Sequence, residues 1–288
     1  MTAKPEVTPF FDADTNTISY VVKNPASPAC AVIDSVLDFD YAAGRTAHRG
    51  ANAIVAFIRA HDLTLTWLIE THVHADHISA APYIQAQLGG KIGIGDRIVV
   101  VQDTFGKVFN EGPAFKRDGS QFDRLFADGD TYAIGGMTAV AWHTPGHTPA
   151  CMTHLIGDAA FVGDTLFMPD GGTARADFPG GDPRILFHSI KRVLALPPDT
   201  RLFICHDYGP NGREIGWEST VAEERAHNIH VHDGIAEDEF VVMRTARDAT
   251  LGMPRLIMPS IQINMRAGNL PPPEADGHSF LKIPLNAL

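Results

Sequence analysis

Residues 71–77 read THVHADH and place three histidines and one aspartate within seven positions. The run follows an apolar segment that predicts a strand and precedes a segment that predicts a helix. In an extended segment the side chains at positions i and i+2 point the same way, so His72 and His74 can face one metal ion. Asp76 and His77 follow where the chain turns into the helix. Because imidazole and carboxylate groups are typical metal ligands, the run predicts a metal site.

Three more candidate ligands each follow a predicted strand later in the chain: His147 in HTPGHTPA, Asp164 in FVGDTLF and His206 in LFICHDY. Each of these residues alone is weak evidence for a metal site, since single loop histidines and turn-forming aspartates are common. Strand ends meet at one edge of a sheet and can assemble ligands from distant segments. The ordered set therefore predicts one centre that uses all seven side chains.

Composition limits the classes of function. The chain has 288 residues, of which 44% are hydrophobic, and this is enough for a sizeable core. A formal net charge of −11 gives no basic surface for phosphate backbones, so we expect no nucleic-acid partner. The three cysteines, Cys30, Cys151 and Cys205, are an odd number and indicate no disulfide framework. We interpret Cys151 and Cys205 as small core residues.

The sequence also indicates where the protein works. No apolar run approaches the length of a membrane span, and the start, MTAKPEVTPFFDAD, lacks the basic and apolar regions of a signal peptide. We therefore expect a cytoplasmic protein that does not enter a membrane. We also expect a homodimer.

Apolar periodicity predicts alternating strands and helices in two successive blocks, which favours two sheets with helices outside. We expect one domain over 1–288, with a C-terminal helical extension and tail from about 229. The stretch 95–126 has irregularly spaced aromatic residues and predicts helical pieces and loop, which we expect to form a wall or a lid. Strands are expected at 18–22, 31–33, 65–70, 91–94, 131–134, 137–143, 151–156, 159–163 and 201–205, and helices at 50–61, 77–88, 183–196 and 219–228.

The succession THVHADH, TPGHT, GDTLF and CHDY resembles the metallo-β-lactamase superfamily over 16–228. That resemblance implies the α/β class and the αβ/βα four-layer sandwich. Within the superfamily the chain is most similar to the persulfide dioxygenases, also called sulfur dioxygenases. This similarity rests on RADF at 175–178, HDY at 206–208 and NMR at 264–266. The chain looks like the bacterial branch labelled β-lactamase-like hydrolases.

The persulfide dioxygenase resemblance implies one iron(II) per chain, held by His72, His147 and Asp164. It implies that four further residues surround this iron: His74, Asp76, His77 and His206. It also implies glutathione persulfide and O2 as substrates, and sulfite and glutathione as products. Two imidazoles and one carboxylate leave positions on iron(II) open for a sulfur and for O2, whereas zinc has no redox state to offer.

Two alternatives stay open on the same residues. In a binuclear hydrolase of the glyoxalase II type, all seven side chains bind two zinc ions or mixed metals, and a bridging hydroxide attacks a thioester. A binding protein with a decayed site is disfavoured, because every metal-site position is present. For an anionic substrate we predict contacts from Arg175, Tyr208 and Arg266.

Overall fold

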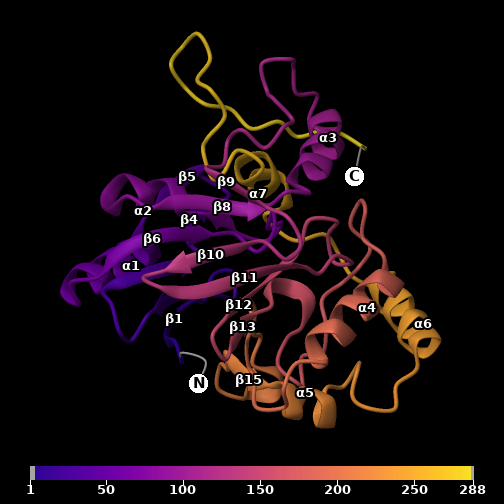
Figure 1. Ribbon diagram of the computed structural model, residues 1–288. Helices are drawn as coiled ribbons and strands as arrows, with labels where there is room; N and C mark the ends of the chain where they lie inside the picture. The colour runs from indigo at the N-terminus through magenta and orange to yellow at the C-terminus, as the bar shows by residue number, and fades with distance from the viewer. Residues whose placement is uncertain (1–3, 287–288) are drawn as a thin grey trace.

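Two six-stranded β-sheets pack face to face, and helices cover their outer faces (Figure 1). The structure is a computed structural model that describes residues 4–286, so both chain ends of the predicted 1–288 range lie outside the described residues. The strands of the first sheet are antiparallel from β1 to β3 and parallel from β3 to β9. In spatial order they are β1 (Glu6–Asp12), β2 (Thr17–Lys23), β3 (Ala29–Ile33), β6 (Thr64–Ile69), β8 (Lys91–Gly95) and β9 (Arg124–Phe126).

The second sheet is antiparallel except for the parallel pair β13 and β14. A third, small sheet orders its strands β5, β4, β7. The second sheet runs β10 (Thr131–Ile134), β11 (Met137–His143), β12 (Met152–Ile156), β13 (Ala159–Phe161), β14 (Arg201–Phe203) and β15 (Glu218–Thr220), and the small sheet contains β4 (Val36–Asp40), β5 (Arg45–Ala47) and β7 (Ile78–Ser79).

Strand β2 shows how the alternation of side chains builds the layers. Tyr20 faces the second sheet, where its ring lies 5.4 Å from that of Phe161 and 5.5 Å from that of Phe203. The next residue, Val21, belongs to the core on the opposite face of the sheet, together with Ile54 of α1. The helices are α1 (Arg49–Ala60), α2 (Ala81–Leu88), α3 (Ile98–Val108), α4 (Pro183–Leu194), α5 (Val221–His227), α6 (Glu237–Asp248) and α7 (Ile257–Asn264), with short 3-10 turns η1 (Gly163–Thr165) and η2 (Pro210–Gly212).

The predicted αβ/βα sandwich is confirmed, but several elements differ from the prediction. Six of the described strands were not predicted: β1, β4, β5, β7, β9 and β15. The helix predicted at 77–88 begins at Ala81, because Ile78 and Ser79 pair with β4 and Pro82 occupies the first helical turn. The helix predicted at 219–228 begins at Val221, because β15 extends to Thr220, whose hydroxyl caps the helix by accepting from the Glu223 amide.

The stretch 95–126 contains helix α3 and strand β9. Phe105, Phe109 and Phe122 are buried in the core of the first sheet, which accounts for the irregular spacing of its aromatic residues. None of the residues that line the cavity at the predicted metal ligands comes from this stretch, so it does not form a wall of the site. Among residues 4–286, no helix has the length and apolarity of a membrane span.

Candidate metal centre

All seven predicted ligands meet at one edge of the sandwich. The loop 71–77 follows β6, His147 lies between β11 and β12, Asp164 lies in η1 after β13, and His206 follows β14. Their ligand atoms form two groups, and within each group all of these atoms lie within 4.8 Å of one another. One group is His72, His147 and Asp164, and the other is His74, Asp76, His77 and His206.

Asp164 lies between the two groups. Its Oδ2 is 3.5 Å from Nε2 of His147 and 3.8 Å from Nε2 of His72. Its Oδ1 is 3.3 Å from Nε2 of His206, which is itself 3.1 Å from Oδ2 of Asp76. The two oxygens of one carboxylate thus face different groups.

Five of the ligand atoms are buried and have no hydrogen-bond partner among the described residues. A buried polar atom without a partner costs roughly 1–3 kcal/mol, and native proteins contain few of them. Five such atoms within the two groups of donors fit metal binding, because bonds to a metal would replace the missing hydrogen bonds. They are Nε2 of His72, Nδ1 of His74, Nε2 of His77, Oδ1 of Asp164 and Nε2 of His206.

Neighbouring groups decide which nitrogen of each ring is free. Nδ1 of His147 donates to the carbonyl oxygen of Arg175 at 2.7 Å, and Nδ1 of His72 lies 3.0 Å from Oγ1 of Thr71. A single hydroxyl, that of Thr17, lies 3.3 Å from Nδ1 of both His77 and His206. Nε2 of these four histidines is therefore left for a metal. Such partners orient ligands and tune the metal that they hold.

His74 is oriented the other way. Its Nε2 lies 3.0 Å from Oδ1 of Asp34 and 3.6 Å from Oε2 of Glu70, and its Nδ1 has no hydrogen-bond partner in the described part of the chain. Asp34 also accepts from the amide and the hydroxyl of Thr71, at 2.8 and 2.9 Å. One buried carboxylate thus holds both ends of the His72–His74 segment.

The electrostatics of the centre suit metal binding. Burial lowers the pKa of His72 and of His74 well below the ordinary value, so both imidazoles are neutral, as a ligand must be. Burial alone would raise the pKa of Asp76, but the neighbouring His206 and His77 bring it well below the ordinary range. Burial also raises the pKa of the Cys151 thiol to about 12 and that of Cys205 well above its usual value. Neither thiol is a nucleophile at neutral pH.

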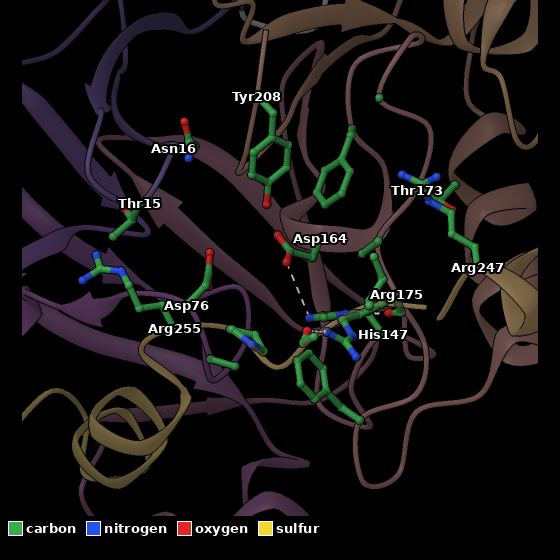
Figure 2. Close-up of a pocket in the computed structure, with 18 of the residues that line it drawn as sticks. Thr15, Asn16, Asp76, His147, Asp164, Thr173, Arg175, Tyr208, Arg247 and Arg255 are labelled. Carbon is green, nitrogen blue, oxygen red and sulfur yellow. Dashed lines mark hydrogen bonds and ion pairs between the residues drawn. The ribbon is translucent and has the colours of Figure 1, made fainter. Parts of the chain in front are cut away.

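A cavity of about 480 Å³ opens onto the centre (Figure 2). Asp76, His147 and Asp164 form part of its floor, and Tyr208, which is 59% exposed, points its hydroxyl into the cavity on the side of Asp164. Tyr208 thus lines the cavity, and its contact with a substrate stays a prediction.

The arginines of the cavity differ in how many of their donors are free. Arg175 lines the cavity, but its guanidinium binds both oxygens of Asp177, at 2.6 and 2.7 Å, and donates to the carbonyl of Gly252. Arg247 and Arg255 are exposed on opposite sides of the centre in Figure 2 and have no ion-pair partner within residues 4–286. Neither arginine was predicted from the sequence, because neither lies in a recognisable motif.

Arg266 is not at this cavity, contrary to the prediction. It is 8% exposed, pairs with Glu111 at 2.7 Å and stacks over the ring of Phe115. These residues line a separate pocket of about 350 Å³. Because the buried guanidinium of Arg266 is already paired with the carboxylate of Glu111, its role is structural.

Three other residues at the centre were also missed: Thr17, Asp34 and Asn264. Asp34 directly follows the buried strand β3, and the predicted ligand Asp164 likewise comes shortly after strand β13. The position of Asp34 at a strand end could therefore have indicated a place at the metal centre. Thr17 carries no comparable signal, because its partners His77 and His206 lie far away in the sequence. Asn264 belongs to the NMR segment at 264–266, but that segment does not indicate which residues its side chain contacts.

The fold and the buried donors define a metal-binding protein of the β-sandwich type with outer helices. Residues 15–206 match the metallo-beta-lactamase superfamily, and the chain belongs to this superfamily. A probable metallo-hydrolase of Burkholderia pseudomallei is 58% identical, over 97% of this chain and 98% of its own length. A Dictyostelium discoideum protein named glyoxylase B2 is 44% identical, over 100% of this chain and 99% of its own.

Two similar proteins carry a different name. The human mitochondrial persulfide dioxygenase ETHE1 is 30% identical, over 90% of this chain and 87% of its own length. The crystal structure of ETHE1 from Myxococcus xanthus superposes with a TM-score of 0.72 at 27% identity, covering 92% of this chain and 100% of that one. The similar proteins therefore include some named as hydrolases or glyoxylases and some named as persulfide dioxygenases.

Proposed function

We propose that this protein is an iron(II)-dependent persulfide dioxygenase, which oxidises glutathione persulfide with O2 to sulfite and glutathione. The observation that carries the proposal is that the ligand atoms of His72, His147 and Asp164 lie within 4.8 Å of one another, so these three side chains can hold one metal ion by themselves. Two imidazoles and one carboxylate on one face of a metal are typical of iron(II) oxygenases. The similarity to the human and Myxococcus xanthus proteins supports the same reaction.

Iron bound there would supply a redox-active ion with open positions for a persulfide sulfur and for O2. The protein supplies the rest. The Arg175 carbonyl fixes the ring of His147, and the buried Thr71 hydroxyl does the same for His72. Arg247 and Arg255, which have no ion-pair partner among residues 4–286, present their positive charges at the mouth of an otherwise acidic protein, where they attract an anionic substrate.

The proposed reaction balances with the stated substrates. Glutathione persulfide, O2 and water give glutathione, sulfite and two protons. The sulfur–sulfur bond breaks, the outer sulfur is oxidised to the level of sulfite, and O2 accepts the electrons. Water contributes the third oxygen of sulfite. No residue of the chain is oxidised, which agrees with the raised pKa of the Cys151 and Cys205 thiols.

A second candidate, a binuclear thioester hydrolase of the glyoxalase II type, is favoured by the position of Asp164. Its two oxygens face His147 and His206 respectively, as a carboxylate shared by two metals would require. The names metallo-hydrolase and glyoxylase among the relatives support this candidate.

One experiment separates the two reactions. Protein purified with its native metal is given glutathione persulfide in an oxygen electrode, and S-lactoylglutathione in a thioester assay without O2. We expect oxygen uptake with sulfite formed in equal amount, and little thioester cleavage. Rapid thioester cleavage without oxygen uptake would show that the hydrolase is the correct reading.

A further inference from the structure

Asn264, the last residue of α7, contacts the metal-binding loop and the strand β7 that follows it through the polar atoms of its side chain. Its Nδ2 donates to the carbonyl oxygens of His74 at 2.9 Å and of His77 at 2.8 Å. Its Oδ1 accepts from the amide of Ser79 at 2.8 Å. The side chain is 5% exposed, so water does not compete for these three hydrogen bonds.

The Ser79 side chain extends this contact to the ring of His74. Its hydroxyl donates to Oε1 of Glu70 at 2.6 Å, and Oε2 of the same carboxylate lies 3.6 Å from Nε2 of His74. The backbone and the ring of His74 are thus both connected to α7.

The end of α7 is itself fixed to the first half of the chain. Nε2 of Gln102 in α3 donates to the carbonyl of Met265 at 2.9 Å, and Arg266 forms its buried ion pair with Glu111. Gly268 packs so closely that an added Cβ would lie 2.9 Å from the carbonyl oxygen of Ser79. The position of Asn264 is therefore rigid, as a positioning role requires.

We infer that Asn264 is a positioning residue of the metal centre: it sets the separation of the His74 and His77 backbones, and so the convergence of their rings. The metal-binding loop needs two donors and one acceptor at a single point. An asparagine amide provides them, whereas an aspartate of the same shape provides no donor. His74 and His77 lie on the same loop as His72, so a shift of their backbones displaces a donor of the one-iron centre as well as donors of a two-metal centre.

The variant Asn264→Asp tests the inference on the metal-loaded protein. It keeps the side-chain shape, removes two donors and places a carboxylate oxygen against two carbonyl oxygens. We expect metal to be lost to EDTA about 10–100-fold faster than from the wild type, as is typical when a group that orients a ligand is removed. The readout is metal release followed with a metal-sensitive dye, and it does not need the enzymatic reaction.

Ser260→Ala is the matched control. Ser260 is buried one turn earlier in α7, and its hydroxyl has no hydrogen-bond partner within the described residues. We expect this variant to lose metal at the wild-type rate. Equal rates for Asn264→Asp and the wild type, or equally fast loss from Ser260→Ala, would overturn the inference.

A measurement on the wild type decides the matter if Asn264→Asp does not fold. Coupling between two sites is reciprocal, so metal that is held through Asn264 must in turn stabilise α7. Hydrogen exchange of the metal-loaded and metal-stripped protein should show reduced protection at 257–268 after stripping, while α1 (Arg49–Ala60) stays protected. Unchanged exchange at 257–268, or the same loss in α1, would contradict the inference.

Discussion

Nδ1 of His147 donates to the carbonyl oxygen of Arg175 across 2.7 Å, so the loop that carries Arg175 orients a metal ligand through its backbone. The guanidinium of the same residue binds Asp177 and the carbonyl of Gly252, and these contacts hold the loop in place. Arg175 thus acts on His147 from both its main chain and its side chain.

Arg175→Ala should therefore weaken metal binding more than substrate binding. The carbonyl remains, but the loop that presents it loses three hydrogen bonds, and we expect metal affinity to fall by about 10-fold. A chelator titration measures the affinity, and the KM for glutathione persulfide is measured with metal in excess. A rise in KM at unchanged metal affinity would mean that the guanidinium binds the substrate directly.

The variants Arg247→Ala and Arg255→Ala should weaken substrate binding more than metal binding, the reverse of what we expect for Arg175→Ala. Both side chains line the cavity and have no ion-pair partner among the described residues, so their charge is available to an anionic substrate. We expect each variant to raise the KM by about 10-fold and to leave kcat nearly unchanged. This increase is at the lower end of the range for charge-assisted hydrogen bonds, because both side chains are exposed. Salt should reduce the difference from the wild type.

Arg59→Ala is a control for loss of one positive charge. Arg59 is exposed on α1 and does not line the cavity. Its variant should keep the wild-type KM. If all three variants change the KM equally, net charge and not the two cavity arginines is responsible.

The ligands could be predicted because their information is local. A metal needs imidazole and carboxylate groups, and the run at 71–77 brings four of them together before any folding is considered. The layers could be predicted because strands and helices alternate in two successive blocks along the sequence, which is typical of two sheets with helices outside.

The residues that orient the ligands could not be predicted, because their roles exist only in three dimensions. Thr17 contacts His206 across 189 positions of sequence, and Asn264 contacts His77 across 187. Arg266 was misplaced for the same reason. Its chemistry suits an anionic substrate, but the fold provides Glu111 as its partner.

A buried carboxyl group away from the metal centre gives the protein a pH-dependent stability. Glu224 is 0% exposed and accepts a hydrogen bond from Asn228 at 2.7 Å. Burial raises its pKa to about 7, from 4.5. Between pH 4.5 and 7 the folded protein holds a proton that the unfolded chain has released, so this group's contribution to stability falls as the pH rises through that window.

Glu224→Gln removes the titration and keeps the size of the side chain. Relative to the wild type, the variant should gain about 3 kcal/mol of unfolding free energy between pH 5 and pH 8. Urea unfolding at the two pH values measures this, and Glu223→Gln, an exposed neighbour, serves as the control. A parallel pH dependence of the wild type and Glu224→Gln would show that the Glu224 carboxyl titrates normally.

The last prediction concerns Asp164 and His206, which a one-iron centre and a two-metal centre use differently. In the proposed dioxygenase Asp164 is the only carboxylate among three ligands, and its Oδ2 faces both His72 and His147. Asp164→Ala then removes a negative charge and a coordination bond together, so we expect protein that contains no iron and is inactive. Elemental analysis and oxygen uptake measure both properties.

His206 belongs to the other group of donors, next to Asp76 and Oδ1 of Asp164. In a one-iron centre it acts on the metal only through Asp164, and removal of such a neighbour typically costs about 10–100-fold in affinity or activity. We therefore expect His206→Ala to keep most of its iron and a measurable rate of oxygen uptake. In the hydrolase His206 holds a metal directly, and its loss should abolish turnover together with one of the two metals. If His206→Ala loses its metal as completely as Asp164→Ala, the one-iron assignment is wrong and the two-metal hydrolase takes its place.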